Sequence, residues 1–195
     1  FKVGVDIAVS KGSVIFQNRL MQLIRYAPST LEVNEIPLLI IPPWINKYYI
    51  LDLKPENSFV KWAVSNGLTV YVISWVNPKQ DLAEIDFDDY GTEGFLEAVN
   101  IVASESETGR LNALGYCIGG TLLGAMLGYM ASKNDNRVSG ATFLTTMLDF
   151  NEPGDLGVFV NERNINVIEK RLDDRGFLSG EDMAFVFNLL RARDL

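Results

Sequence analysis

The chain contains no histidine and only one cysteine, Cys117, among its 195 residues. A single cysteine excludes an internal disulfide and suits a reducing compartment. The lack of histidine matters more, because a cysteine nucleophile normally needs a histidine base within hydrogen-bond reach. We therefore expect either that the base lies outside these residues or that Cys117 is not catalytic, and we favour the first.

The sequence also lacks a long apolar run and an excess of basic residues. Its longest apolar stretch, residues 37–45, is interrupted by Pro42 and Pro43 and is too short to cross a bilayer. No basic segment followed by an apolar one begins the chain. Lys and Arg number 17 against 25 Asp and Glu, and the net charge of -8 argues against a nucleic-acid partner. These absences predict that the protein has neither a transmembrane segment nor a nucleic-acid partner, and the single cysteine suits a reducing cytoplasm.

What remains is an ordinary globular composition. With 48% hydrophobic residues, the chain is long enough for one domain with a core. It opens on Phe1 and not on methionine. Together with the missing histidine, this leads us to expect an incomplete piece of a longer protein.

Hydrophobic periodicity predicts an alternation of strands and helices. Residues 1–9 and 13–16 alternate and predict an antiparallel hairpin, which residues 21–26 can extend. Later strands are expected over residues 37–41, 68–75, 111–116 and 138–145, and helices over residues 55–66, from Asp88 or Asp89 as the cap to Gly109, and over residues 119–132. This order predicts an α/β fold with a mostly parallel sheet and helices on both faces.

Two of these helices carry further expectations. In the first, Phe59, Trp62 and Ala63 recur at helical spacing and should face inward. The helix over residues 119–132 is apolar nearly all round, which predicts that it is buried on every side.

The character of the chain changes after residue 150. Two amphipathic helices are expected over residues 165–172 and 181–190, with residues 173–176 as their connection. A polar, helical segment after a core strand is typical of a cap. We therefore assign residues 1–150 to the N-terminal part of a core and residues 151–195 to the start of a cap or lid.

The sequence around Cys117 predicts an apolar strand, a very tight turn and a helix. Gly115 and Gly119 stand two residues before and two residues after the cysteine, as in the Gly-x-nucleophile-x-Gly elbow, with cysteine in place of the usual serine. A nucleophile raised on such a strained turn crowds both positions, so glycine is favoured at each. The alternative is that Cys117 is a small buried hydrophobe between strand and helix.

Two backbone amides are expected to face a carbonyl attacked by Cys117. One is the N–H of Ile118 at the helix start, and the other should come from the loop after the first parallel strand, at Trp44 or Ile45. Asp149 is the one acid in a catalytic position, just past a sheet strand, and the alternative for it is a turn or cap residue.

Other binding motifs are not supported. The acidic residues between the second strand and the next helix predict a solvated face and a helix cap, because neither histidine nor a regular ligand spacing joins them: Asp81, Glu84, Asp86, Asp88 and Asp89. Neither a dinucleotide-binding nor a P-loop glycine motif is present. We expect no metal and no bound cofactor.

Cysteine in place of serine favours one kind of chemistry. Moving an acyl group from a substrate thioester to a protein thiol is close to an even exchange, so the acyl group stays activated. We therefore expect acyl transfer from a thioester rather than simple ester hydrolysis.

Two stretches resemble a known family. Residues 115–121 (Gly-Tyr-Cys-Ile-Gly-Gly-Thr) and residues 42–53 are similar to the polyhydroxyalkanoate synthases, also called poly(3-hydroxyalkanoate) polymerases. Matching pieces at residues 74–78, 88–90 and 144–150 extend the resemblance to nearly the whole chain. Residues 46–53 resemble the single-subunit, short-chain type, class I.

The resemblance implies an α/β-hydrolase core in which Cys117 carries the growing 3-hydroxyacyl chain as a thioester and Ile118 supplies an oxyanion amide. Each incoming (R)-3-hydroxyacyl-CoA would release the coenzyme A that it carries. It also implies a homodimer at the surface of cytoplasmic polymer granules. The family's catalytic histidine and aspartate lie beyond Leu195, and Asp149 does not match that acid, so these residues alone should be inactive.

Two other functions stay open at this point. One is a thioesterase or depolymerase on the same fold. The other is a non-catalytic α/β-hydrolase-like module that binds granules or a protein partner.

Overall fold

The computed structural model describes residues 1–154, 157 and 161–180. The chain divides into two compact units, each made of two segments. The first comprises Phe1–Val76 and Phe87–Leu148, and the second comprises Asn77–Asp86 and Asp149–Leu195. The assignment of residues 151–195 to a cap or lid stays a prediction.

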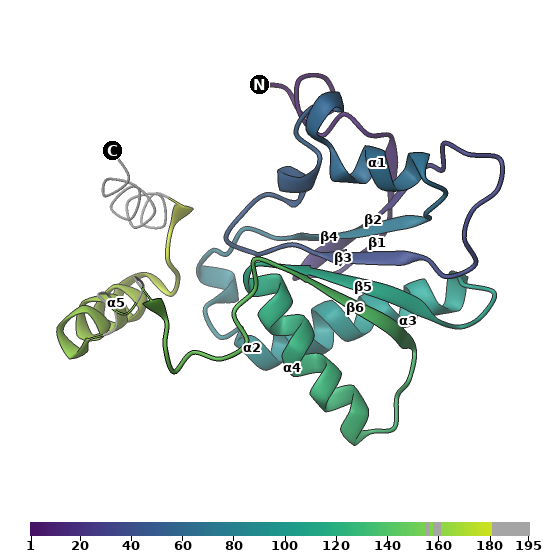
Figure 1. Ribbon diagram of the computed structural model, residues 1–195. Coiled ribbons are helices and arrows are strands. Elements are labelled where there is room, and N and C mark those ends of the chain that lie inside the picture. The colour runs from purple at the N-terminus through teal and green to yellow at the C-terminus, as the bar shows by residue number, and fades with distance from the viewer. Residues whose placement is uncertain (155–156, 158–160, 181–195) are drawn as a thin grey trace. The chain divides into compact units, whose positions relative to one another are not determined.

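The first unit is built on a sheet of six strands among the described residues, in the order β1-β2-β4-β3-β5-β6 (Figure 1). The strands are β1 (Gly12–Gln17), β2 (Met21–Tyr26), β3 (Leu38–Ile41), β4 (Val70–Trp75), β5 (Leu111–Tyr116) and β6 (Val138–Leu144). β1 and β2 form an antiparallel hairpin that joins β4 antiparallel, whereas β4, β3, β5 and β6 are parallel. The predicted α/β class with an antiparallel hairpin is confirmed.

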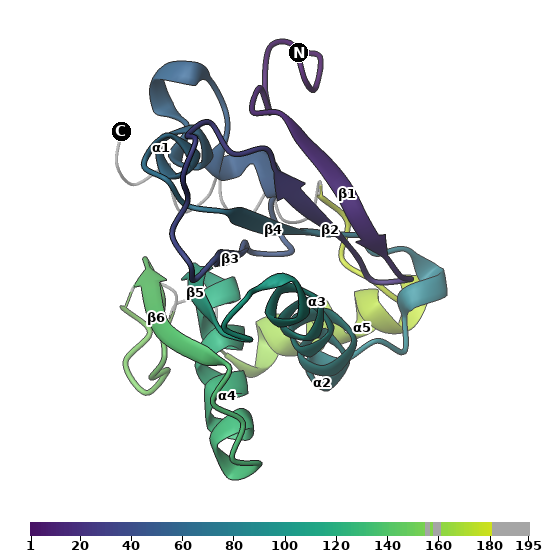
Figure 2. The same cartoon turned by 90° about the vertical axis from the view of Figure 1, so that its right-hand side faces the viewer.

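Helices cover both faces of this sheet. The helices of the first unit are α1 (Phe59–Ser65), α2 (Phe87–Asp89), the π-helical segment η4 (Tyr90–Leu96), α3 (Glu97–Glu105), α4 (Ile118–Ser132) and the short turns η1 (Tyr48–Leu51) and η2 (Pro55–Asn57). α1 lies on one face, and α3 and α4 lie on the other (Figures 1 and 2).

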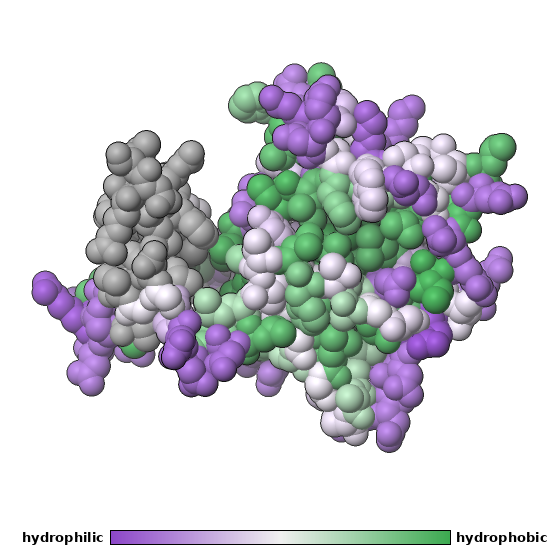
Figure 3. Space-filling view, in the orientation of Figure 1, coloured by the Kyte–Doolittle hydropathy of each residue, from purple (hydrophilic) through white to green (hydrophobic). Residues whose placement is uncertain are grey.

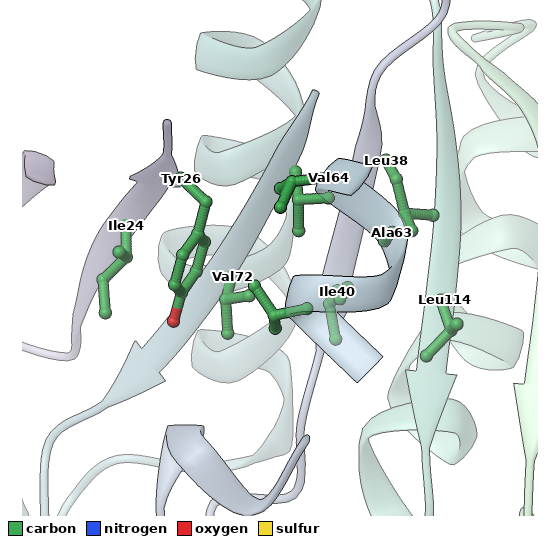
Figure 4. Close-up of a cluster of buried hydrophobic side chains, with 10 residues drawn as sticks. Ile24, Tyr26, Leu38, Ile40, Ala63, Val64, Val72 and Leu114 are labelled. Carbon is green, nitrogen blue, oxygen red and sulfur yellow. The ribbon is translucent and has the colours of Figure 1, made fainter. Parts of the chain in front are cut away.

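The core lies on both sides of β3, whose four residues are all buried. Leu38 and Ile40 join the cluster under α1, together with Ala63 and Val64 (Figure 4). Because side chains alternate along a strand, Leu39 and Ile41 face the opposite layer of helices. A strand covered on both faces has no polar position, which explains the continuous apolar run that predicted it.

The prediction of a strand over residues 1–9 is wrong. Residues 2–7 close a compact turn in which the Gly4 N–H donates to the Ile7 carbonyl at 2.7 Å, and the Lys2 N–H donates to the Asp6 carboxylate at 2.7 Å. Gly4 has a φ of 81°, which an extended strand cannot contain. The hairpin exists, but its strands are β1 and β2.

The predicted inward position of Trp62 is also wrong, because its side chain is 55% exposed. Ser58 caps α1 by accepting the Lys61 N–H at 2.9 Å, and Pro55 belongs to the separate turn η2. α1 packs on the sheet through Val60, Ala63 and Val64, which are buried, so Trp62 lies on another face of the helix. Trp62 instead lies against Phe59 at 5.5 Å between ring centroids.

α4 is not buried on every side within the described structure, contrary to the prediction. Its buried face includes Leu122, Leu123 and Met126, whereas Tyr129 is 44% exposed. Exposed Phe143 and Leu148 lie near the same helix. Figure 3 shows hydrophobic side chains gathered on the viewed face of the first unit.

Helix limits also differ from the predictions elsewhere. Asp88 and Asp89 lie inside α2 and not before it as caps. In the second unit, α5 (Glu162–Arg175) includes most of the expected connection at residues 173–176 and ends at Gly176, which has a φ of 77°. The second helix expected there, over residues 181–190, lies outside the described residues.

The second unit also contains the short turn η3 (Gln80–Leu82). A Cβ added to Gly176 would lie 2.8 Å from the Ala83 Cβ, so the end of α5 packs against this turn region. No helix in the described part of the chain has the length and apolar character needed to span a membrane.

A fully buried acid, Asp52, ties the N-terminal segment to α1. Its carboxylate accepts the Ser10 N–H at 3.1 Å, the Ser10 hydroxyl at 2.7 Å and the Ser58 hydroxyl at 2.5 Å. Its backbone carbonyl accepts the Ala8 N–H at 2.8 Å. Burial, and next the nearby Asp52 charge, raise the pKa of the Tyr26 hydroxyl.

Asp52→Asn keeps the shape of this side chain but places N–H donors where three donors already converge. We expect the free energy of unfolding of the full-length protein to fall by about 2–3 kcal/mol, because a buried hydrogen bond is lost. Urea unfolding followed by circular dichroism measures this change. Glu56→Gln, at an exposed acid on η2, is the matched control, and equal stability of the two variants would contradict this role of Asp52.

Candidate active site

Cys117 stands at the turn between β5 and α4, as the sequence predicts. Its backbone has a φ of 54° and a ψ of -127°, a conformation that non-glycine residues rarely adopt. Its N–H donates to the Leu144 carbonyl at 2.9 Å, and its carbonyl accepts the Gly120 N–H at 2.9 Å. The thiol is free and half-buried. The backbone is therefore held in a strained turn by hydrogen bonds on both sides.

Three glycines make this turn possible. A Cβ on Gly115 would lie 2.3 Å from the Gly120 Cα, and a Cβ on Gly119 would lie 2.2 Å from the Ile41 carbonyl oxygen. These distances are far below van der Waals contact, so the first turn of α4 packs directly on the ends of β3 and β5. The predicted pair, Gly115 and Gly119, is explained by this packing.

The third glycine, Gly120, did not enter the sequence prediction of the elbow. A Cβ there would lie 2.0 Å from the Thr146 hydroxyl oxygen, in the loop after β6. Thr121 donates its hydroxyl to the Met147 carbonyl at 2.8 Å and holds the same loop on α4. Thr145 has a φ of 44°, so a second strained residue follows the strand beside the elbow. The sequence signals were the doubled glycine and the spacing of Gly120, Gly124 and Gly128 four residues apart, which predicts that the helix packs close to a neighbour.

The two predicted oxyanion donors come from different elements, both at the carboxyl ends of the parallel strands. Ile118 is the first residue of α4, where a backbone N–H has no acceptor within the helix. Trp44 and Ile45 are the central residues of a turn closed by the Asn46 N–H, which donates to the Pro43 carbonyl at 3.2 Å. β3 and β5 are parallel neighbours, so this turn and the elbow lie at the same edge. Their role as donors stays a prediction.

An aromatic cluster supports the turn at Trp44, and sequence reasoning missed it. Trp44 stacks on Tyr90 with 4.6 Å between ring centroids, and Trp75 meets Trp44 edge-on at 6.1 Å. The Trp75 indole N–H donates to the Pro42 carbonyl at 2.7 Å. Burial raises the pKa of the Tyr90 hydroxyl. Phe87 completes the cluster at 6.2 Å from Trp44.

Asp149 belongs to the second compact unit and is exposed. Its carboxylate accepts the Asn151 N–H at 3.0 Å, which closes a local turn. This contact is the one expected of a turn residue, and a catalytic role for Asp149 stays a prediction. Among the described residues, no three histidine, cysteine or acidic side chains are grouped so that they could hold a metal ion.

Two of the solved structures with a similar arrangement of strands and helices are esterases. One of two fungal esterases from Rhizomucor miehei matches with a TM-score of 0.55 and 18% identity, covering 78% of this chain and 49% of that one. An ester-hydrolase from the metagenome of Lake Arreo matches with a TM-score of 0.54 and 14% identity, covering 80% of this chain and 50% of that one. At these identities the likeness concerns the fold alone, and that fold is the α/β-hydrolase fold.

Sequence comparison then finds relatives that share one activity in their names. Residues 1–63 match the family model described as Poly-beta-hydroxybutyrate polymerase (PhaC) N-terminus. The whole chain is 50% identical to a poly(3-hydroxyalkanoate) polymerase of Methylorubrum extorquens and covers 32% of it. It is 47% and 40% identical to poly(3-hydroxyalkanoate) polymerase subunits PhaC of Rhizobium meliloti and Cupriavidus necator, and covers 32% and 34% of them.

The whole chain is thus similar to poly(3-hydroxyalkanoate) polymerases, which confirms the resemblance seen in the sequence. It spans about a third of the length of these relatives.

The close packing at the elbow predicts opposite effects of alanine at two glycines of α4. Gly119→Ala should lower the free energy of unfolding by about 2–3 kcal/mol, because the new methyl meets the backbone of β3, which has no room to move. Gly128→Ala, with nothing within 4 Å of the added Cβ, should raise it by about 0.5–1 kcal/mol through helix propensity.

Urea unfolding of the full-length variants measures both changes. If Gly119→Ala were as stable as Gly128→Ala, the close approach of α4 to β3 would be wrong.

Proposed function

We propose that Cys117 is the nucleophile of an acyltransferase that builds a polyester from (R)-3-hydroxyacyl-CoA thioesters. The observation that carries this proposal is the placement of the chain's single cysteine in a strained strand-to-helix turn of an α/β-hydrolase fold. The similarity of the whole chain to poly(3-hydroxyalkanoate) polymerases supports it. Serine at such an elbow suits ester hydrolysis, whereas a thiol keeps a transferred acyl group activated.

In the first step, the Cys117 Sγ attacks the thioester carbonyl and gives its proton to a base. The carbonyl oxygen becomes an oxyanion, which the backbone N–H groups of Ile118 and of Trp44 or Ile45 would stabilise. The bond to the coenzyme A sulfur then breaks, and that sulfur leaves with a proton. The products are a 3-hydroxyacyl thioester on Cys117 and free coenzyme A.

In the second step, the hydroxyl of one acyl unit attacks the thioester of another, so an ester bond forms and a thiol is released. No histidine is present among the 195 residues, so the base for both steps would come from outside them. This chain would supply the nucleophile and the oxyanion donors.

The surroundings of this reaction are proposals too. We infer that the enzyme works in the cytoplasm at the surface of polymer granules, as a homodimer of the class I type. Coenzyme A would arrive with the substrate and would not be a resident cofactor.

Cys117→Ala in the full-length protein should abolish turnover of 3-hydroxybutyryl-CoA, with free coenzyme A and polymer both falling by about 10³-fold or more. Cys117→Ser should also be severely impaired, because an ester-linked chain is a poorer acyl donor. A thiol reagent measures coenzyme A, and extraction with chromatography measures polymer.

The two readouts separate the alternatives. Release of coenzyme A without polymer by the wild-type protein would favour a thioesterase. Absence of both products would contradict the proposal that the protein is an enzyme acting on this thioester. Full activity of Cys117→Ser would contradict the argument for a thiol.

A further inference from the structure

We propose that Trp75 is a positioning residue that sets the location of the oxyanion-binding loop. This inference rests on the proposed function, because it assigns a role in the acyl-transfer step at Cys117. It concerns the indole N–H and not only the size of the ring.

The hydrogen bond that supports this inference joins the ends of two neighbouring strands. Trp75 is the last residue of β4, and Pro42 is the first residue after β3. The indole N–H donates to the Pro42 carbonyl at 2.7 Å, and the Trp75 side chain is buried. A buried carbonyl without a donor is costly, so this bond fixes where the chain leaves β3.

The Pro42 carbonyl group lies directly against the elbow. A Cβ added to Gly119 would lie 2.9 Å from the Pro42 carbonyl carbon. Gly119 is the second residue of α4, next to Ile118, whose N–H is one predicted donor. A shift of Pro42 would therefore change the spacing between the two predicted donors, and oxyanion stabilisation depends steeply on such spacing.

The indole ring is itself held on several sides. A Cβ on Gly94 would lie 2.4 Å from the ring, so the π-helical segment η4 packs its backbone on the indole. The Tyr90 ring lies 5.2 Å from the Trp75 ring, and Trp44 meets its edge. π-helical segments occur frequently at functional sites. The clamped ring gives the N–H a fixed direction, and the same ring contacts the turn that carries Trp44.

A purely structural tryptophan would act through its ring, so the decisive variant removes the N–H alone. Replacement of Trp75 by 3-benzothienylalanine keeps the bicyclic shape with sulfur in place of N–H. Trp75→Phe removes the N–H together with one of the two rings and keeps an aromatic side chain. Trp62→Phe on α1 is the matched control, because Trp62 is half-exposed on the other face of the sheet.

Two reactions of Cys117 are compared in the full-length protein. Acylation by 3-hydroxybutyryl-CoA passes through an oxyanion, whereas alkylation by iodoacetamide occurs at a saturated carbon and does not. We expect both Trp75 variants to lower kcat and the acylation rate by about 10- to 100-fold, with KM and the alkylation rate changed less than about threefold. Trp62→Phe should leave all four quantities unchanged.

Each other outcome overturns the inference. Unchanged acylation in the 3-benzothienylalanine protein would show that the N–H has no positioning role, even if Trp75→Phe failed to fold. An equal fall in acylation and alkylation would indicate a general distortion of the elbow. If the wild-type protein formed no acyl thioester on Cys117, the proposed function would fail first, and the role of Trp75 would fail with it.

Discussion

The backbone contact between the first turn of α4 and the end of β3 is the constraint on which the candidate site depends. Gly119 lies so close to the Ile41 carbonyl that no side chain fits between them. Gly115 and Gly120 make a similar contact with each other. Together these contacts leave Cys117 at the apex of a turn with positive φ, where its strain is balanced by the packing of a helix on a buried sheet.

A second set of contacts supports the loop opposite the elbow by different means. The Pro42–Trp44 segment is held by side chains, through the indole N–H of Trp75 and the stacked ring of Tyr90. The elbow is thus positioned by the absence of side chains, and the loop by large aromatic ones. Both sets of contacts meet at Pro42, which packs against α4 on one side and accepts the hydrogen bond from Trp75 on the other.

The fold is shared with esterases, but the chemistry we propose differs from ester hydrolysis because of one atom. A sulfur nucleophile keeps an acyl group as a reactive thioester, which suits repeated transfer to a hydroxyl. The same residues contain no histidine, so nucleophile and base would come from separate parts of the protein. Proton transfer would then depend on how those parts assemble around Cys117.

The sequence by itself determined the elbow, the buried parallel strands and the resemblance to the polymerases, because each depends on residues close together in the chain. The spacing of Gly115, Cys117 and Gly119 needs no distant partner to be recognised. Tertiary structure alone decided the rest. Residues 1–9 alternate like a strand, yet the segment turns and binds Asp52, more than forty residues away in sequence.

The positions of Trp62 and Trp75 were also decided by tertiary structure. Both are large apolar residues expected in a core, but α1 packs on the sheet through Val60, Ala63 and Val64 and leaves Trp62 exposed. The pairing of β3 with β4 brings Trp75 to a carbonyl 33 residues away. Long-range packing decides which face of a helix is buried and how the strands pair. The periodicity of residues within one segment reveals neither.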